Sequence, residues 1–507
     1  MPVHSIRSLL SGLSAVPGHK PWPRYEIGAQ TWEELGRALG AGQGDLLGLW
    51  ADPGQVHMAL RADDVPAPCV VSLGIKERTF PSVARHHAPA ARLERAVHDL
   101  HGFEAIGTPD RRPWLDHGQW GVTAPLGLSL KSDRRDPADY DFLPVNGEGL
   151  HQVAVGPVHA SIIEPGHFRF HANGETVARL EARLGYVHKG VDSLLVDADM
   201  EKAARILARV SGDSTVALGF AFARAVEAAL AASVPARATI LRGVMAELER
   251  IANHIGDIGA ICNDASFALI HAHCGMLRER VLAACDAAFG HRLMMDRIVP
   301  GGVTQDVTPE GVRAVLEALE AIAPPFAEIV RLYDETPSLQ DRTCTTGAIS
   351  NELVRKWGAG GYVGRAAGRE FDCRRDLAYL PYAGVAFAVP MFQTGDVDAR
   401  VWVRIREVET SIGLVRTWLA ALPGGAVFAP PPRPDGVREG IAMTEAFRGD
   451  LLVWLRITEG GRIAHAHVRD ASWFQWPLLE AAIEHNIVAD FPICNKSFNC
   501  SYSGHDL

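Results

Sequence analysis

The sequence has eight cysteines in 507 residues, but no two of them form a C-x-x-C pair. Such scattered cysteines do not make the disulfide framework that holds small secreted domains together. The first residues also lack the composition of an export signal. We therefore expect reduced thiols and a cytoplasmic protein.

Long apolar runs are also missing. The most apolar extended segment begins at Leu218 and is interrupted by Arg224 and Glu227, whereas a membrane-spanning helix needs about 20 largely apolar residues. We therefore do not expect the chain to cross a membrane by itself. No stretch is dense in Lys and Arg, and the formal net charge of −10 argues against a nucleic-acid-binding surface.

The motifs that bind nucleotide phosphates are absent as well. The Gly-rich run over 358–368 follows a helix-like segment, whereas a dinucleotide loop has G-x-G-x-x-G spacing directly after a strand. No G-x-x-x-x-G-K-[ST] sequence occurs either. These absences argue against a dinucleotide or ATP site in this chain.

The apolar content of 47% is enough to bury the cores of two or three domains. Residues 1–130 mix strand-like pieces with one helical pattern and predict a small α/β domain. The polar stretch 131–150 has no periodicity and is typical of a linker. Residues 151–507 are predicted to form the second, larger domain.

This larger domain is predicted to be mainly helical. Residues 151–175 alternate like short strands, with a turn at Asn173-Gly174, and predict a small antiparallel sheet. Apolar residues at helical spacing then occur over 241–261, 272–290 and 398–422. Strand patterns return over 450–470. We therefore expect an α+β fold whose larger domain is a helix bundle with a small antiparallel sheet.

Two groups of residues have side chains that could bind a metal. The histidines and cysteine of "HAHC" over 271–274 lie on a predicted helix, where close neighbours point apart, so core packing is the favoured interpretation. Cys494, Cys500 and His505 lie near the last residue, but the two thiols are five residues apart. This spacing is not typical of a structural metal site.

Four motifs occur in order along the chain: "VGPVHASIIEPGHFRF" at 155–170, "RLEARLGYVHKGVDSLL" at 179–195, "ELERIANHIGDIGAICNDA" at 247–265 and "GDVDARVWVRIREVETSI" at 395–412. Together they resemble the large subunit of membrane-bound, energy-converting [NiFe] hydrogenases of the formate-hydrogenlyase and hydrogenase-4 type. That subunit shares ancestry with the quinone-site large subunit of respiratory complex I. Residues 80–115 resemble the smaller complex I subunit that docks beside the large one.

The sequence departs from these hydrogenases where they bind metal. Their nickel and iron are held by two C-x-x-C motifs, and Ser211 and Ser214 stand at the first. Cys494 and Cys500 are too far apart to replace the second. A hydroxyl is a poor nickel ligand, so we expect no metal site and no [NiFe] centre. The resemblance implies that the former metal cavity is lined by Ser211, Asp213, Ser214, Asn495 and Lys496.

Resemblance to complex I implies a different use of this cavity. His167 and Asp264 match a His and an Asp at the complex I quinone site, and a carboxylate bonded to an imidazole suits a proton donor. The corresponding Tyr is absent. Each residue also has a purely structural interpretation, because His167 follows a turn and Asp264 could end a helix. Arg292 resembles an arginine that faces the last iron–sulfur cluster of the neighbouring subunit.

The resemblance therefore implies a peripheral-arm subunit on the inner face of the cytoplasmic membrane. It would receive electrons from a small iron–sulfur subunit and pass them to a quinone-like or other acceptor, beside antiporter-like membrane subunits that translocate ions. The ultimate electron donor would be NAD(P)H or ferredoxin. The alternative is a coupling subunit without redox chemistry, and a minor alternative is a [NiFe] hydrogenase.

Overall fold

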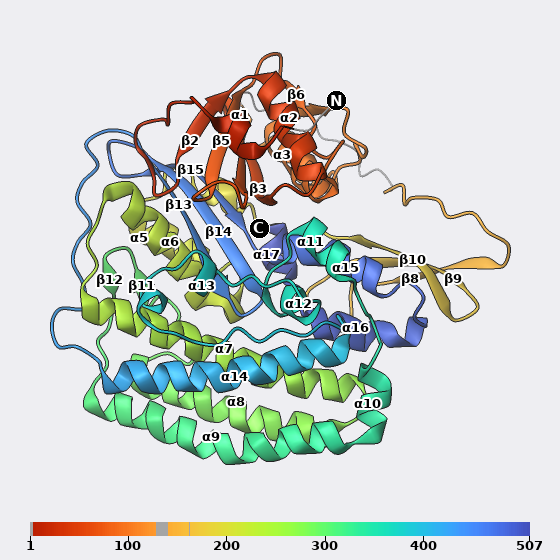
Figure 1. The fold of residues 1–507 in the computed structure, drawn as a ribbon, viewed down its shortest axis with the longest axis vertical. Helices are drawn as coiled ribbons and strands as arrows, with labels where there is room; N and C mark the ends of the chain where they lie inside the picture. Colours follow the sequence, from red (N-terminus) through yellow and green to blue (C-terminus); the bar gives the residue numbers. More distant parts are fainter. Residues whose placement is uncertain (1–3, 128–139, 162) are drawn as a thin grey trace.

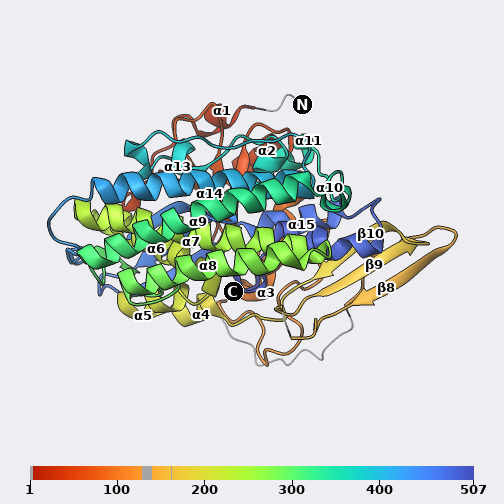
Figure 2. The same cartoon turned by 90° about the horizontal axis from the view of Figure 1, so that it is seen from below.

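The computed structural model describes residues 4–127, 140–161 and 163–507. An α/β region from the N-terminal part lies on one side of a central sheet, and a bundle of long helices lies on the other (Figure 1). A narrow three-stranded sheet projects from the body (Figure 2). The mixed α+β fold and the helix bundle predicted from the sequence are confirmed.

The N-terminal region contains a four-stranded sheet in the order β2-β5-β4-β3. Its strands are β2 (Arg24–Ile27), β3 (Asp45–Asp52), β4 (Gln55–Arg61) and β5 (Cys69–Gly74), followed by the small pair β6 (Thr79–Pro81) and β7 (Glu104–Ile106). Its helices are α1 (Ile6–Leu10), α2 (Ala29–Gly40) and α3 (Ala91–His101). Gly102 caps the C-terminus of helix α3, and its φ of 68° is a left-handed conformation that glycine adopts without strain.

The central sheet joins the N-terminal region to the rest of the chain. It has the order β1-β13-β14-β15, with β1 (His19–Lys20), β13 (Arg438–Ala446), β14 (Gly449–Ile457) and β15 (Ile463–Arg469). The rings of Trp50 and Trp454 also meet across this junction, 5.5 Å apart. The two regions therefore share a core, and the division near residue 130 stays a prediction. Of the predicted linker, residues 131–139 lie outside the described residues.

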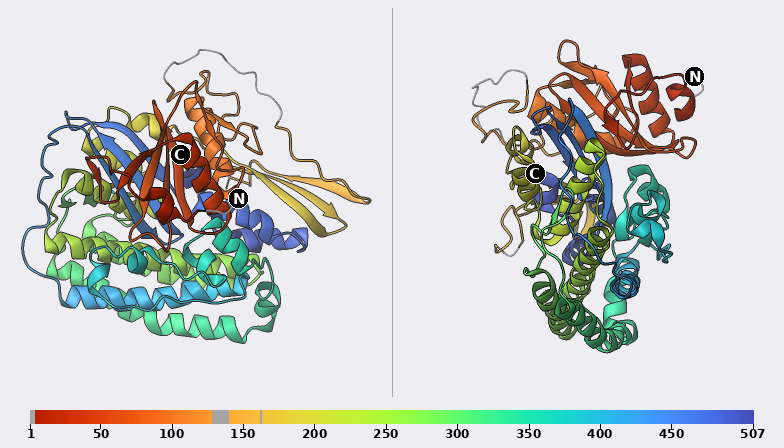
Figure 3. Two further views of the ribbon diagram at one scale, coloured as in Figure 1. Left: turned by 45° about the horizontal axis from the view of Figure 1, so that its top comes forward. Right: turned by 90° about the vertical axis from the view of Figure 1, so that its left-hand side faces the viewer.

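The bundle is built from α6 (Thr215–Leu230), α7 (Ala236–Asp264), α8 (Ala268–Phe289), α9 (Pro309–Glu335) and α14 (Val397–Ala420). The predicted apolar stripe of α7 is buried, as at Leu241 and Ile255. The polar side of α7 is buried too, because α14, α6 and α16 (Phe491–Phe498) contact it. Figure 3 shows this bundle at the end of the molecule opposite the N-terminal region.

The shorter elements surround this frame. They are α4 (Val191–Leu195), α5 (Met200–Leu207), β11 (Ile298–Val299), β12 (Gly302–Val303), α10 (Pro337–Thr343), α11 (Asn351–Trp357), α12 (Gly361–Ala366), α13 (Cys373–Asp376), α15 (Ser472–Ala482) and α17 (Tyr502–Asp506). In the Gly-rich run, a Cβ on Gly361 would lie 2.0 Å from the carbonyl oxygen of Arg448. Close packing against the β13–β14 turn therefore explains that glycine.

The projecting sheet has the order β10-β9-β8, with β8 (Leu150–Val155), β9 (His167–Asn173) and β10 (Thr176–Arg183). The predicted antiparallel hairpin is confirmed. Side chains alternate between its faces. Phe168 and Phe170 pack against Phe491, so His167 and Arg169 lie on the opposite, polar face.

Among the described residues, no single helix combines the length and apolarity needed to cross a membrane. One pair of helical segments, Met200–Leu207 with Gly212–Leu230, reaches that threshold only when taken together, and it is bent by 113°.

Candidate functional site

Residues 211–214, where the resemblance places the first metal-binding motif of the hydrogenases, form a compact polar turn before α6. Ser211 donates a hydrogen bond of 2.6 Å from its hydroxyl to Asp213, and Ser214 donates one of 3.3 Å to the same carboxylate oxygen. Asn253 of α7 donates to the backbone carbonyl of Asp213 at 2.8 Å. The three residues predicted from the first lost motif therefore meet in one place.

An arginine that the sequence did not point to completes this cluster. Arg448, in the turn between β13 and β14, donates two hydrogen bonds of 2.6 and 2.9 Å to the Asp213 carboxylate. It also donates to the hydroxyl of Ser214 at 3.1 Å and to the carbonyl oxygen of Asn499 at 2.5 Å. Burial opposes ionisation of Asp213, but the Arg448 guanidinium outweighs it and lowers the pKa of Asp213 to about 2.

The C-terminal segment forms the opposite wall of this cluster. Ser501 donates a long hydrogen bond of 3.4 Å to the hydroxyl of Ser211, and Asn499 donates one of 2.9 Å to Asp257. Arg404 of α14 donates to the second carboxylate oxygen of Asp257 at 3.1 Å. Serine and asparagine side chains beside two arginines therefore occupy the region where the resemblance placed thiolates.

The side chains present here do not fit a nickel or iron ion. The guanidinium of Arg448 is a fixed cation with no lone pair to offer, so it would repel a metal ion. Burial raises the pKa of the Cys494 thiol to about 11 and that of the Cys500 thiol further, so both stay protonated at neutral pH. Within the described residues, no group of three or more His, Cys, Asp or Glu side chains could hold a metal ion.

His505 is not placed to bind a metal with the two cysteines. Its Nδ1 donates to Asp506 at 2.8 Å, and its Nε2 accepts from the indole N–H of Trp114 at 3.2 Å. The ring also stacks on Trp473, with centroids 4.1 Å apart. Both ring nitrogens of this buried histidine are therefore used by the protein. The histidines at the start of α8 are exposed and Cys274 is buried, so they do not converge either.

Asn495 and Lys496, predicted to line the same cavity, lie on the partly exposed side of α16. Lys496 is the positive charge that acts most strongly on Asp264. Asn495 instead acts to lower the pKa of the Tyr502 phenol, against the raising effect of burial. Their contacts therefore link them to the end of α7 and to α17, and their place in the cavity lining stays a prediction.

His167 lies at the start of β9 with both ring nitrogens occupied. Its Nδ1 donates to the carbonyl oxygen of Gly156 at 3.3 Å, and its Nε2 accepts from Nε of Arg169 at 3.3 Å. Burial, together with the positive charge of Arg169, lowers the pKa of His167. The imidazole is therefore neutral at pH 7, with its proton on Nδ1.

Asp264 is the last residue of α7 and lies half-buried beside Lys496. Burial raises its pKa, while Lys496 and His271 act in the opposite direction. His167 and Asp264 are not hydrogen-bonded to each other, because the partners of His167 are Gly156 and Arg169. The structure thus does not join the two residues into the pair that a proton donor would use, and their predicted roles remain to be tested.

Arg292 lies on the surface after α8 and forms an ion pair with Glu279, with distances of 2.5 and 2.7 Å. About half of the Arg292 side chain is exposed. Met294, two residues later, is buried. Arg292 is therefore accessible from the surface, where a neighbouring subunit could meet it.

A buried network of charges connects α7, α14 and β13. Arg365 bonds to Glu407 at 2.5 Å and to Glu445 at 2.9 Å, and His254 donates to Glu407 at 2.8 Å. Arg250 also reaches Glu407 at 3.3 Å. Buried charges of this kind are tolerated only when each one is paired. The clue in the sequence was the row of Arg and Glu residues inside otherwise apolar helices.

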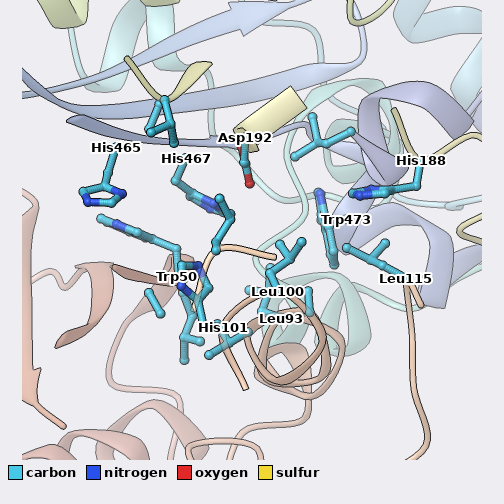
Figure 4. A pocket seen from close by; sticks show the side chains of 18 residues that line it. Trp50, Leu93, Leu100, His101, Leu115, His188, Asp192, His465, His467 and Trp473 are labelled. Carbon is cyan, nitrogen blue, oxygen red and sulfur yellow. The ribbon is translucent and has the colours of Figure 1, made fainter. Parts of the chain in front are cut away.

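A small cavity of about 40 Å³ lies at the junction of the N-terminal region and the central sheet (Figure 4). The side chains of His101, Asp192, His467 and Trp473 line it. Each has one buried polar atom without a hydrogen-bond partner among the described residues. Burial raises the pKa of Asp192 to about 7. The volume and the unpaired atoms fit two or three water molecules.

Comparisons with known proteins place the chain in a family. The family described as "Respiratory-chain NADH dehydrogenase, 49 Kd subunit" matches residues 267–435. An NADH-quinone oxidoreductase subunit of Roseiflexus sp. (strain RS-1) is 32% identical over 275 residues, which cover 54% of this chain and 73% of the relative. The chain belongs to the complex I 49 kDa and [NiFe] large-subunit family.

Hydrogenase-type members of this family are similar over more of the chain. Formate hydrogenlyase subunit 5 of Escherichia coli (strain K12) is 28% identical over 445 residues, covering 86% of this chain and 78% of the relative. A chain of the membrane-bound sulfane sulfur reductase (MBS), an archaeal respiratory membrane complex, superposes with a TM-score of 0.67 at 22% identity. This match covers 72% of our chain and 100% of that chain, and it shows a shared fold.

Between α6 and the C-terminal segment, the chain thus holds the Asp213–Arg448 ion pair, with the hydroxyls of Ser211 and Ser214 hydrogen-bonded to the carboxylate of Asp213.

Proposed function

We propose that this chain is a peripheral-arm subunit of a membrane-associated complex related to complex I and to energy-converting hydrogenases. It receives electrons from a small iron–sulfur subunit and passes them, with protons, to a quinone-like or other acceptor. The observation that carries this proposal is the similarity to subunits of NADH-quinone oxidoreductases and of formate hydrogenlyase. The Asp213–Arg448 ion pair argues against the hydrogenase alternative, because it leaves no ligand set for nickel.

The partners are proposed by analogy with the relatives. The proposed complex contains the small iron–sulfur subunit, antiporter-like membrane subunits that translocate ions, and a source of electrons such as NAD(P)H or ferredoxin. The chain would sit on the inner face of the cytoplasmic membrane. In support, relatives include subunits of NADH-quinone oxidoreductases and of formate hydrogenlyase. The exposed Arg292 is the proposed contact with the iron–sulfur partner.

Proton delivery is the part that this chain's own residues would perform. Asp264 has a raised pKa, so it is protonated over a wider pH range than an ordinary carboxyl and suits a proton donor. His167 is neutral, and its Nε2 is engaged by Arg169. It could donate a proton only after taking one up and releasing Arg169. Asp264 is therefore the stronger of the two proposed donors.

A second candidate function is a coupling subunit without redox chemistry. The filled cavity favours it, because the Arg448 guanidinium takes up space in which an acceptor would have to bind. In this case the scaffold would only transmit conformational changes to the membrane subunits.

Turnover of the purified complex with a water-soluble quinone separates these functions. Electron transfer predicts that Asp264→Asn and His167→Ala lower quinone reduction, whereas Arg331→Gln, on the exposed face of α9, leaves it unchanged. Unchanged turnover in both site variants, with a fully assembled complex, would instead support the coupling subunit. Stoichiometric nickel in the wild-type complex would contradict both and restore the hydrogenase interpretation.

A further inference from the structure

A second, larger cavity lies on the polar face of the projecting sheet. Its volume is about 680 Å³, within the range of pockets that bind small molecules. The side chain of His167 lines it from β9, and Arg183 lines it from the end of β10. The segments 112–119 and 140–142 form its other walls. The former metal cavity shares none of these residues.

Arg183 is a buried cation without a matching anion. Its side chain is 3% exposed, and none of the described carboxylates forms an ion pair with it. It donates to the carbonyl oxygen of Trp114, and its guanidinium lies 4.3 Å from the ring centroid of Tyr140. Burial lowers the pKa of Arg183 to about 10, so it remains charged at neutral pH. Buried charges are normally paired, so this one points to an absent anion.

Asp99 is the carboxylate whose charge acts on Arg183, and it already accepts hydrogen bonds from the backbone. One carboxylate oxygen of Asp99 accepts from the backbone N–H groups of Trp114 and Leu115, at 2.7 and 2.8 Å. Of the acids that line the cavity, Asp116 accepts from the N–H of Gly118 at 2.7 Å, and Asp141 is exposed. The charge of Asp99 acts to raise the pKa of Arg183, but none of these carboxylates forms an ion pair with it.

A second arginine reaches the same cavity. Arg169 donates to Gln152 at 3.0 Å and to His167, both of which are uncharged acceptors. Arg112 is different, because Asp110 and Glu181 each bind it at 2.7 Å. Arg169 and Arg183 are therefore the two cations of this cavity that lack a carboxylate partner among the described residues.

The cavity also has flat, apolar walls. Phe142 lies under the guanidinium of Arg169, 4.5 Å from it, and Tyr186 is 38% exposed at the rim. The ring of His117 meets Tyr186 edge-on at 4.6 Å. Aromatic surfaces of this kind bind the face of a planar ring, while arginines bind the oxygens of a phosphate or carboxylate.

We propose that this cavity binds a small organic anion in which a planar ring carries a phosphate or carboxylate group. Arg183 and Arg169 hold the oxygens, and Phe142 and Tyr186 contact the ring. The volume accommodates a molecule the size of a mononucleotide. His167, a proposed proton donor, also lines this cavity, but the binding measurements below do not depend on the proposed electron transfer.

Calorimetric titration of the full-length chain tests this proposal with four probes. AMP and nicotinate carry both a ring and an oxyanion, adenosine carries only a ring, and inorganic phosphate carries only the oxyanion. We expect AMP or nicotinate to bind at least tenfold more tightly than adenosine and phosphate. If neither of the two binds, the proposal is wrong. If phosphate binds as tightly as AMP, the part of the proposal that concerns the aromatic walls is wrong.

Variants assign the binding to the named residues. Arg183→Gln should weaken binding of the better probe at least tenfold, and so should Arg169→Gln, which changes a less buried side chain and is the safer variant for folding. Arg331→Gln, far along the sequence on the exposed face of α9, is the matched control and should bind like the wild type. Wild-type affinity in a folded Arg169→Gln variant, shown by an unchanged melting temperature, would contradict the proposal.

Discussion

Arg448 and Asp213 are 235 residues apart in the sequence and form a two-point ion pair, with distances of 2.6 and 2.9 Å. The pair connects the turn between β13 and β14 to the N-terminus of α6. It also orders the hydroxyls of Ser211 and Ser214, which both face the carboxylate. The ion pair is thus an internal cross-link between two segments that are distant in the sequence.

Arg448→Met should destabilise the protein by about 2–3 kcal/mol, because it leaves the Asp213 carboxylate without its partner. The value lies below the ~3–5 kcal/mol typical of fully buried pairs, since a third of the Asp213 side chain is exposed. Urea unfolding measures the change. Arg406→Gln, which removes an exposed ion pair on α14, is the control and should change stability by less than about 0.5 kcal/mol. Equal stability of Arg448→Met and wild type would show that the pair is not a cross-link.

Restoring cysteines at the first lost motif should not restore metal binding. In Ser211→Cys combined with Ser214→Cys, Arg448 still occupies the centre of the cluster and repels a divalent cation. We expect less than a tenth of an equivalent of nickel by elemental analysis after growth with nickel. Adding Arg448→Ala to the two cysteines is the comparison. Stoichiometric nickel in the double variant would show that Arg448 does not exclude the metal.

The sequence predicted the elements whose signal is local. The stripe from Leu241 to Ile258 predicts α7, and the turn at Asn173-Gly174 predicts the β9–β10 hairpin, because helix and strand periodicity depend on near neighbours. The sequence could not predict Arg448, since nothing near it shows that Asp213 lies opposite. Strand alternation places His167 and Phe168 on opposite faces of the sheet, but the sequence could not show that the face of His167 lines a separate cavity, because segments distant in the sequence form its other walls.

Arg292→Gln should separate a docking role from a structural one. The ion pair with Glu279 is exposed, so its loss should leave the free energy of unfolding of this chain nearly unchanged. If Arg292 contacts the iron–sulfur subunit, the same change should reduce recovery of that subunit when the complex is purified through this chain. Arg313→Gln, on the exposed face of α9, is the control for loss of one surface charge. Full recovery of the partner with Arg292→Gln would contradict the proposed contact.

Asp192→Asn should flatten the pH dependence of stability between about pH 4 and pH 7. Burial raises the pKa of Asp192 from an ordinary value of 3.8 to about 7 in the folded chain. In this interval the unfolded chain ionises Asp192 while the folded chain keeps it protonated, so wild-type stability falls as the pH rises. The wild type should lose up to about 3–4 kcal/mol relative to the variant, because each pKa unit corresponds to about 1.4 kcal/mol.

Urea unfolding at pH 4, 5.5 and 7 measures this difference in stability. The nearby histidines His101 and His467 are common to both proteins, so their titration cancels. Asp197→Asn, an exposed carboxyl just after α4, is the matched control and should give a curve parallel to the wild type. A parallel curve for Asp192→Asn as well would mean that Asp192 ionises normally beside the cavity.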